Sequence, residues 1–165
     1  LFRPISDNGM CKSKAKLNGK TAIITGSNTG IGKETAKELA KRGARIIMAC
    51  RNIKEGIKAA DEIKQTTEND NVVVKVLDLA SFKSIRNFAD NINSYEERID
   101  ILVNNAGVFL CPQSKTEDGF EMHFGVNYLG HFLLTLLLVK KIKKSSPARI
   151  INLTSNLHRS NNTSN

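Results

Sequence analysis

Short runs of apolar, often β-branched residues alternate along the chain with segments of helical periodicity. The apolar runs predict strands near residues 20–25, 45–50, 72–77, 100–104 and 148–154. The segments between them predict helices near residues 31–42, 53–67, 81–95 and 119–144. Strands separated by helices favour right-handed crossovers and a parallel sheet that is covered on both faces. We therefore expect an α/β, doubly wound (Rossmann) fold with about five strands in the order 3-2-1-4-5.

Composition and charge narrow the choice of partners. The 165 residues carry 25 Lys and Arg against 16 Asp and Glu, so the formal net charge is +9. That charge suits nucleic acid, a membrane surface or an anionic small molecule. Aromatic residues are only 5% of the chain and no basic stripe is interleaved with them, which argues against nucleic-acid binding. The three cysteines form no CxxC pair or metal-ligand pattern, so we expect no metal site and a reducing compartment.

The segment TGSNTGIG, at residues 25–32, joins the first predicted strand to the first predicted helix. Glycine permits positive φ angles and close approach of the backbone to a ligand. The start of the helix presents free N–H groups and the positive end of its dipole, so a pyrophosphate is the expected occupant. The alternative is a turn that is tight for packing alone. The predicted phosphate-binding residues are Gly26, Ser27, Asn28, Thr29, Gly30, Ile31 and Gly32.

The chain is predicted to contain one domain preceded by an arm. Residues 19–165 are predicted to form one dinucleotide-binding domain, incomplete at its C-terminus, because a chain of this length supports one α/β domain. Residues 1–18 are predicted to form a basic arm or linker. The longest apolar run, at residues 132–139, is shorter than the roughly 18 residues of a membrane span and predicts a buried helix.

The end of the second predicted strand distinguishes between nicotinamide cofactors. Sites for NAD place an acidic residue there, where it bonds the ribose hydroxyls. Here Cys50 is followed by Arg51, so the position has no carboxylate and has a fixed cation next to it. A 2′-phosphate would be attracted by Arg51, and this favours NADP over NAD. The alternative is an ordinary surface arginine at the start of a helix.

Five ordered motifs resemble those of the short-chain dehydrogenases/reductases. They are TGSNTGIG at 25–32, LDLA at 77–80, NNAG at 104–107, GVNYLGHFLL at 125–134 and RIINLTS at 149–155. The resemblance extends from Gly19 onward. Within the family, the segment at 30–51 and the motif at 125–134 are similar to the retinol dehydrogenase branch, which is microsomal and prefers NADP.

The resemblance implies further contacts with the cofactor. Asp78 would accept a hydrogen bond from the adenine amino group, with Leu79 beside the ring. A helix-capping role for Asp78 is the alternative, because Ser81 follows closely.

In the NNAG motif, the Asn104 side chain would bond backbone groups of neighbouring strands. Asn105, Ala106 and Gly107 would lie against the cofactor, and the last two would leave room for its ribose.

Two catalytic residues are implied in the same way. Asn127, expected to be buried among apolar neighbours of the long helix, would hold a water in a proton relay, or would be only a satisfied buried amide. Ser155 would bond the substrate oxygen. The family's tyrosine with a lysine four residues later is absent, because Tyr95 is followed at that spacing by Ile99 and Tyr128 by Phe132.

The expected function is that of an NADP-dependent oxidoreductase that interconverts an alcohol and a carbonyl, with a retinoid or similar apolar substrate. This chain is expected to be an inactive fragment of that enzyme, and its last strand is expected to have an uncovered edge. A non-catalytic nucleotide-binding or regulatory fragment is the alternative. The resemblance further implies attachment to the cytosolic side of the endoplasmic reticulum membrane, through a segment upstream of Leu1, and allows a homodimer. A cytoplasmic protein is the alternative location.

Overall fold

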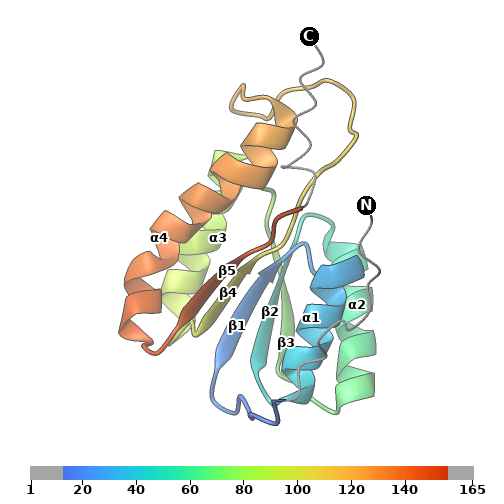
Figure 1. Cartoon of the computed structure of the whole chain (residues 1–165), viewed down its shortest axis with the longest axis vertical. Coiled ribbons are helices and arrows are strands. Elements are labelled where there is room, and N and C mark those ends of the chain that lie inside the picture. The colour runs from blue at the N-terminus through green and yellow to red at the C-terminus, as the bar shows by residue number, and fades with distance from the viewer. Residues whose placement is uncertain (1–12, 156–165) are drawn as a thin grey trace, which may run out of the picture.

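The computed structural model describes residues 13–155, in which five strands form one parallel sheet (Figure 1). The strands are β1 (Thr21–Thr25), β2 (Arg45–Cys50), β3 (Val72–Val76), β4 (Ile101–Asn104) and β5 (Arg149–Asn152). Their order across the sheet is β3-β2-β1-β4-β5, and every neighbouring pair is parallel. The predicted fold class and strand order are confirmed.

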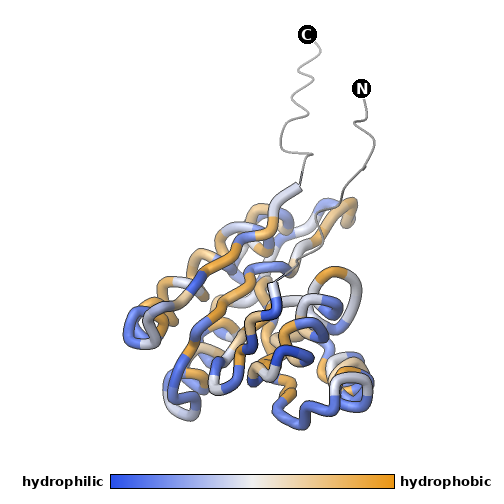
Figure 2. Tube along the Cα trace, turned by 60° about the horizontal axis from the view of Figure 1, so that its bottom comes forward, coloured by the Kyte–Doolittle hydropathy of each residue, from blue (hydrophilic) through white to orange (hydrophobic). Residues whose placement is uncertain are grey.

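In the described part of the chain, α-helices cover both faces of this sheet (Figure 1). One pair comprises α1 (Gly30–Lys41) and α2 (Ile53–Thr67), and the other comprises α3 (Phe82–Tyr95) and α4 (His131–Lys144). Each pair encloses its own apolar core against the sheet. In Figure 2 the apolar parts of the trace run along the strands, and polar parts lie in the turns between elements.

Alternate residues of the central strands supply the two cores. Ile46 and Met48 of β2 belong to the core under α1 and α2, whereas Ile47 and Ala49 belong to the core under α3 and α4. Successive side chains of a strand point to opposite faces. A strand that is buried on both faces therefore has an unbroken apolar sequence.

The helix predicted at 119–144 is the element that differs most from the expectation. A π-helix, η1 (Phe124–Gly130), precedes α4, and an isolated antiparallel bridge between Lys115 and Glu121 lies in the loop before it. The buried helix predicted at 132–139 is only half buried: Leu134 and Leu138 are fully buried, whereas Phe132 is 53% exposed. The apolar run has one face on the core and one that contacts solvent.

Three other expectations concern the last strand, the N-terminal arm and membrane-spanning helices. All four residues of β5, the last strand of the sheet, are exposed, so the expectation of an uncovered edge is confirmed. Of the predicted arm, residues 1–12 lie outside the described residues, and 13–17 have no regular secondary structure. None of the described helices combines the length and apolar character that crossing a membrane requires.

A buried carboxylate ties the beginnings of β1 and β4 together. Asp100 is only 3% exposed and accepts a hydrogen bond from Thr21 N at 2.9 Å. It also pairs with Arg98 at 2.7 Å and with Lys20 at 3.0 Å. Burial alone would raise the pKa of Asp100, but these hydrogen bonds outweigh it and lower the pKa to about 2.

We expect Asp100→Asn to reduce the free energy of unfolding at pH 7 by about 2 kcal/mol, because the folded state binds the Asp100 proton less tightly than the unfolded chain does. That stabilisation is complete above about pH 4, the unfolded value, and is lost as the pH falls through about 2. Urea unfolding of both proteins at pH 7 and pH 2.5 measures the difference. An equal difference at the two pH values would contradict this role of the carboxylate.

Candidate cofactor-binding and catalytic site

The glycine turn between β1 and α1 brings backbone segments very close together. Gly26 and Gly30 have φ angles of 63° and 54°. A Cβ atom at Gly26 would lie 2.9 Å from Ala106 Cα, and one at Gly32 would lie 2.4 Å from Gly26 O. The turn therefore requires glycine for conformation at Gly26 and Gly30, and for space at Gly26 and Gly32.

The buried side chain of Ser27 links this turn to the backbone of β1 by a hydrogen bond. Its side chain is fully buried, and its Oγ donates to Ile24 O at 2.9 Å and lies 3.7 Å from Cys50 Sγ. Burial raises the pKa of the Cys50 thiol, and the contact with Ser27 opposes that rise. Of the seven predicted phosphate-binding residues, Ser27 alone does not line the crevice above the turn.

The start of α1 has the features of an anion site. Thr29, its N-cap residue, makes no side-chain hydrogen bond to the first turn. By contrast, Asn52 caps α2 and Ser81 caps α3 through bonds to backbone N–H groups. The first N–H groups of α1 thus have no side-chain cap at the positive end of the helix dipole. A diphosphate has the charge and the acceptor oxygens that fit them.

A crevice of about 630 Å³ opens above this helix start, at the carboxyl ends of the strands. It is bordered by all the predicted cofactor residues except Ser27. They are Gly26, Asn28, Thr29, Gly30, Ile31, Gly32, Arg51, Asp78, Leu79, Asn105, Ala106 and Gly107.

Two charged residues in this crevice follow β2 and β3, which lie on the same side of β1 and its glycine turn. Arg51 follows β2, is exposed, and has no ion-pair partner within residues 13–155. Asp78 follows β3, and its Oδ1 accepts a hydrogen bond from Ala80 N at 2.9 Å. Ser81, rather than Asp78, caps α3, so the alternative that Asp78 is a helix cap is wrong.

In the NNAG motif, Asn105 makes the backbone hydrogen bond that was expected of Asn104. Asn105 Nδ2 donates to Thr25 O at 2.8 Å and so ties β4 to the backbone of β1. Asn104 bonds side chains instead, Thr135 Oγ1 at 3.1 Å and Asn152 Oδ1 at 2.7 Å. The prediction that Asn104 bonds the strand backbones is wrong. Its side chain is directed toward α4 and β5, and the next residue faces β1.

Thr25, at the end of β1, connects the loop after β4 to α4 by hydrogen bonds. Its Oγ1 accepts hydrogen bonds from Asn105 N and Ala106 N, both at 2.9 Å. Because both acceptor positions are filled, the hydroxyl is a donor in its other contacts, which are His131 Nε2 at 2.8 Å and Val103 O at 3.4 Å. The shorter contact makes His131 Nε2 the main acceptor of the proton. His131 Nδ1 then carries the ring proton and donates to Asn127 O at 3.2 Å.

Sequence reasoning did not identify His131 as a site residue. It is buried, and burial lowers its pKa although the bond to the Asn127 carbonyl opposes the change. The neutral ring is also the form that this hydrogen-bond pattern requires. The spacing in the sequence could have indicated its position, because His131 lies four residues after Asn127. On a helix this spacing, about one turn, places two residues on the same face.

Asn127 is exposed, so the expectation that it is buried is wrong. Its Oδ1 accepts from Val108 N at 2.8 Å and its Nδ2 donates to Val108 O at 3.0 Å. The side chain therefore holds the loop that follows β4, and does so from a π-helix, an element that is often found at functional sites.

Ser155 and Asn127 border a second cavity of about 610 Å³. Four residues line both this cavity and the nucleotide crevice: Ile31, Asn105, Ala106 and Gly107. The two spaces are therefore adjacent, and a ligand extending from the glycine turn past Gly107 would reach the side of the cavity where Asn127 and Ser155 lie. Within residues 13–155, no group of His, Cys, Asp and Glu has the geometry of a metal site.

Comparison with known proteins identifies the family. The family model described as short chain dehydrogenase matches residues 20–164. The chain belongs to the short-chain dehydrogenase family. Solved structures agree: a short chain dehydrogenase from Shigella flexneri has a TM-score of 0.75 and 26% identity, over 88% of this chain and 58% of that one. RhlG of Pseudomonas aeruginosa, solved as an active-site complex with NADP, has a TM-score of 0.73 and 29% identity, over 85% and 56%.

Retinol dehydrogenases are among the most similar relatives of this short-chain dehydrogenase. Mouse retinol dehydrogenase 13 is 61% identical over 158 residues, which are 96% of this chain and 47% of that protein. Mouse retinol dehydrogenase 12 is 56% identical over 157 residues, which are 95% and 50%. The chain thus spans about half the length of the relatives that it matches. The resemblance to the retinol dehydrogenase branch is confirmed.

Proposed function

We propose that this chain is the nucleotide-binding part of an NADP-dependent oxidoreductase that interconverts an alcohol and a carbonyl. The observation that carries the proposal is the uncapped start of α1 under the glycine turn, in a crevice that also contains Arg51. The diphosphate would bind the first turn of α1, and the Arg51 guanidinium would pair with the 2′-phosphate. Asp78 and Leu79, at the β3 end of the crevice, would hold the adenine.

The bound nicotinamide would supply or accept the hydride. Ser155 would donate a hydrogen bond to the substrate oxygen, and Asn127 would fix the loop at Val108 beside the reacting groups and support a water in the proton relay. Neither tyrosine of the sequence has a lysine four residues later, so we propose that the 165 residues alone bind and orient the reactants without turnover.

The cavity beside the crevice supports an apolar substrate. Tyr128, Phe132 and Leu153 border it, and each of these side chains is at least 39% exposed. A retinoid is the specific substrate we propose, because the relatives are retinol dehydrogenases. The same relationship supports association with the endoplasmic reticulum membrane as the proposed location.

Replacing Arg51 with glutamine tests the choice of cofactor. We expect the Kd for NADPH to rise about 10- to 100-fold and the Kd for NADH to stay within about twofold, because only NADPH carries the phosphate. Calorimetric titration of the chain with each nucleotide measures both constants. Arg86→Gln, on the exposed side of α3, is the matched control and should change neither. Equal affinity of the unaltered chain for NADPH and NADH would show that Arg51 does not select the cofactor.

The absence of the tyrosine–lysine pair also favours a second candidate, a non-catalytic nucleotide-binding or regulatory fragment. The two candidates differ in what extends the chain. Detection of a protein that continues past Asn165 and oxidises retinol with NADP would support the enzyme. Detection of only the 165-residue chain, with nucleotide bound, would support the fragment.

A further inference from the structure

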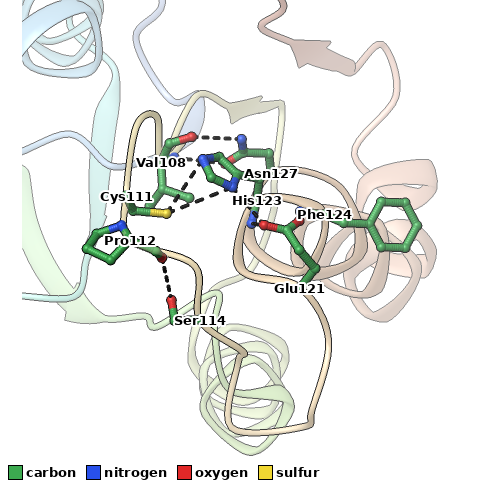
Figure 3. A network of polar contacts seen from close by, with 8 residues as sticks. All are labelled: Val108, Cys111, Pro112, Ser114, Glu121, His123, Phe124 and Asn127. Atoms are coloured by element: carbon green, nitrogen blue, oxygen red, sulfur yellow. Dashed lines mark hydrogen bonds and ion pairs between the residues drawn. The ribbon is translucent and has the colours of Figure 1, made fainter.

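Three side chains in the loop before η1 form a cluster that nucleotide binding does not use. Cys111 Sγ lies 3.5 Å from His123 Nε2 and 3.9 Å from His123 Nδ1 (Figure 3). His123 Nδ1 lies 2.7 Å from Glu121 Oε1. The cluster therefore places a thiol next to an imidazole, and the imidazole next to a carboxylate.

The carboxylate fixes the tautomer of the imidazole. Glu121 Oε1 and Oε2 accept hydrogen bonds from His123 N and Phe124 N, at 2.9 Å and 2.7 Å. These backbone bonds and the bond from the His123 ring lower the pKa of Glu121 to about 2, so it is ionised at neutral pH. An ionised carboxylate can only accept, so Nδ1 carries a proton, and in the neutral form of the ring Nε2 is the acceptor. The acceptor nitrogen is the one nearer the thiol.

The thiol is also open to reagents. Cys111 is partly exposed and forms no disulfide, whereas Cys50 is buried. The two residues before it, Phe109 and Leu110, are 67% and 82% exposed, so apolar surface adjoins it in the loop. Leu110 has a φ of 51°, which is unusual for a residue other than glycine.

Neither a metal site nor a simple helix cap explains the whole of this cluster. A metal site is not supported, since no set of three ligands of this kind occurs within residues 13–155. Capping of the helix explains why Glu121 bonds His123 N and Phe124 N. It does not require the His123 ring to bond the same carboxylate, nor a cysteine to lie against that ring.

We propose that Cys111, His123 and Glu121 form a thiol-modification site for α,β-unsaturated carbonyl compounds, with Cys111 as the nucleophile. His123 Nε2 accepts the thiol proton while Glu121 holds the ring. The sulfur forms a bond to the β-carbon of the electrophile, and the π pair of the C=C bond moves to the carbonyl oxygen as an enolate. His123 then returns the proton to the α-carbon. The product is a thioether, with no oxidant consumed and no group released.

The test is the rate at which the full 165-residue chain reacts with N-ethylmaleimide. Peptide mass spectrometry reports Cys11, Cys50 and Cys111 separately. At pH 6.5 we expect Cys111 to react at least about tenfold faster in the folded chain than in the chain unfolded in urea, since positioned proton transfer contributes factors of this size or more. Equal rates would overturn the proposal, and this comparison requires no variant.

Variants identify the groups that act on the thiol. His123→Gln should slow labelling of Cys111 about tenfold, most strongly at the acidic end of a series from pH 5 to pH 9, where ordinary thiols are protonated. Glu121→Ser should slow it less and preserve the helix cap, because serine is a good N-cap residue. Ser114→Ala is the matched control, because within residues 13–155 the Ser114 Oγ atom bonds only Pro112 O, in the same loop (Figure 3).

Each outcome of this series is decisive. A His123→Gln chain that is folded by circular dichroism and reacts as fast as the unaltered chain would overturn the proposal. Slowing in Ser114→Ala equal to that in His123→Gln would indicate a disturbed loop and would also overturn it. Replacing the maleimide with trans-2-nonenal should give the same order of rates and a mass increase equal to the whole aldehyde.

Discussion

Replacement of Thr25 with valine is expected to lower the free energy of unfolding by about 3 to 5 kcal/mol, the largest change in stability that the site implies. Valine has nearly the same shape but cannot accept the hydrogen bonds from Asn105 N and Ala106 N or donate to His131. Asn105 N, Ala106 N and the His131 ring would each lose a hydrogen-bond partner. Leaving a buried polar group unpaired costs about 1–3 kcal/mol. Urea unfolding monitored by circular dichroism measures the change.

Thr21→Val is the matched control on the same strand. Thr21 is 5% exposed and its hydroxyl makes no hydrogen bond within the described residues, so its replacement should cost less than about 0.5 kcal/mol. If the two substitutions cost the same, the network around Thr25 would have no special part in stability.

Replacement of Gly26 with alanine is expected to weaken NADPH binding about 100-fold, which is about 2.7 kcal/mol. The new Cβ would lie 2.9 Å from the Cα and Cβ atoms of Ala106, so the glycine turn or the β4 loop must move. Both segments border the crevice, and a cradle for a diphosphate tolerates little displacement of its N–H groups. Titration with NADPH measures the loss of affinity.

Gly19→Ala separates this displacement from backbone strain. Gly19 has a φ of 72°, similar to that of Gly26, but an added Cβ would meet nothing within 4 Å. Both substitutions should cost about 1–2 kcal/mol of stability from the left-handed conformation. Only Gly26→Ala should weaken binding, and an equal loss of affinity in Gly19→Ala would attribute the effect to general destabilisation.

The sheet was predictable because its signals are strong and local. Residues 45–50 are apolar at nearly every position, since β2 is buried by helices on both faces, and such a run between turn residues is typical of a parallel strand. The glycine turn was predictable for a similar reason: at Gly26, Gly30 and Gly32 the conformation or the available space excludes other residues. The glycine turn predicted from the sequence borders a crevice in the structure.

Side-chain directions at the ends of elements were less predictable. Asn104 and Asn105 are adjacent and chemically identical, and which one faces β1 depends on where β4 stops, a matter of one residue. Asn127 was expected to be buried because its neighbours are apolar, but the π-helix turns it outward toward Val108. No periodicity in the sequence indicates that extra residue per turn.

Contacts across the long loop could not be predicted at all. Cys111 and His123 are separated by 12 residues, and an isolated bridge between Lys115 and Glu121 brings the two ends of that stretch together. Widely spaced cysteines alone suggest no chemistry, and only the folded loop places the thiol beside an oriented imidazole.

The location of the diphosphate is the claim on which the proposed function most depends. An NMR titration of the ¹⁵N-labelled chain with NADPH tests it directly, because each backbone amide is observed separately. The largest shifts are expected at the amides of Gly30, Ile31 and Gly32, in the uncapped first turn of α1, followed by those of Arg51. Saturation with NADPH that leaves these amides unshifted, or that shifts mainly residues outside the crevice, would contradict the assignment.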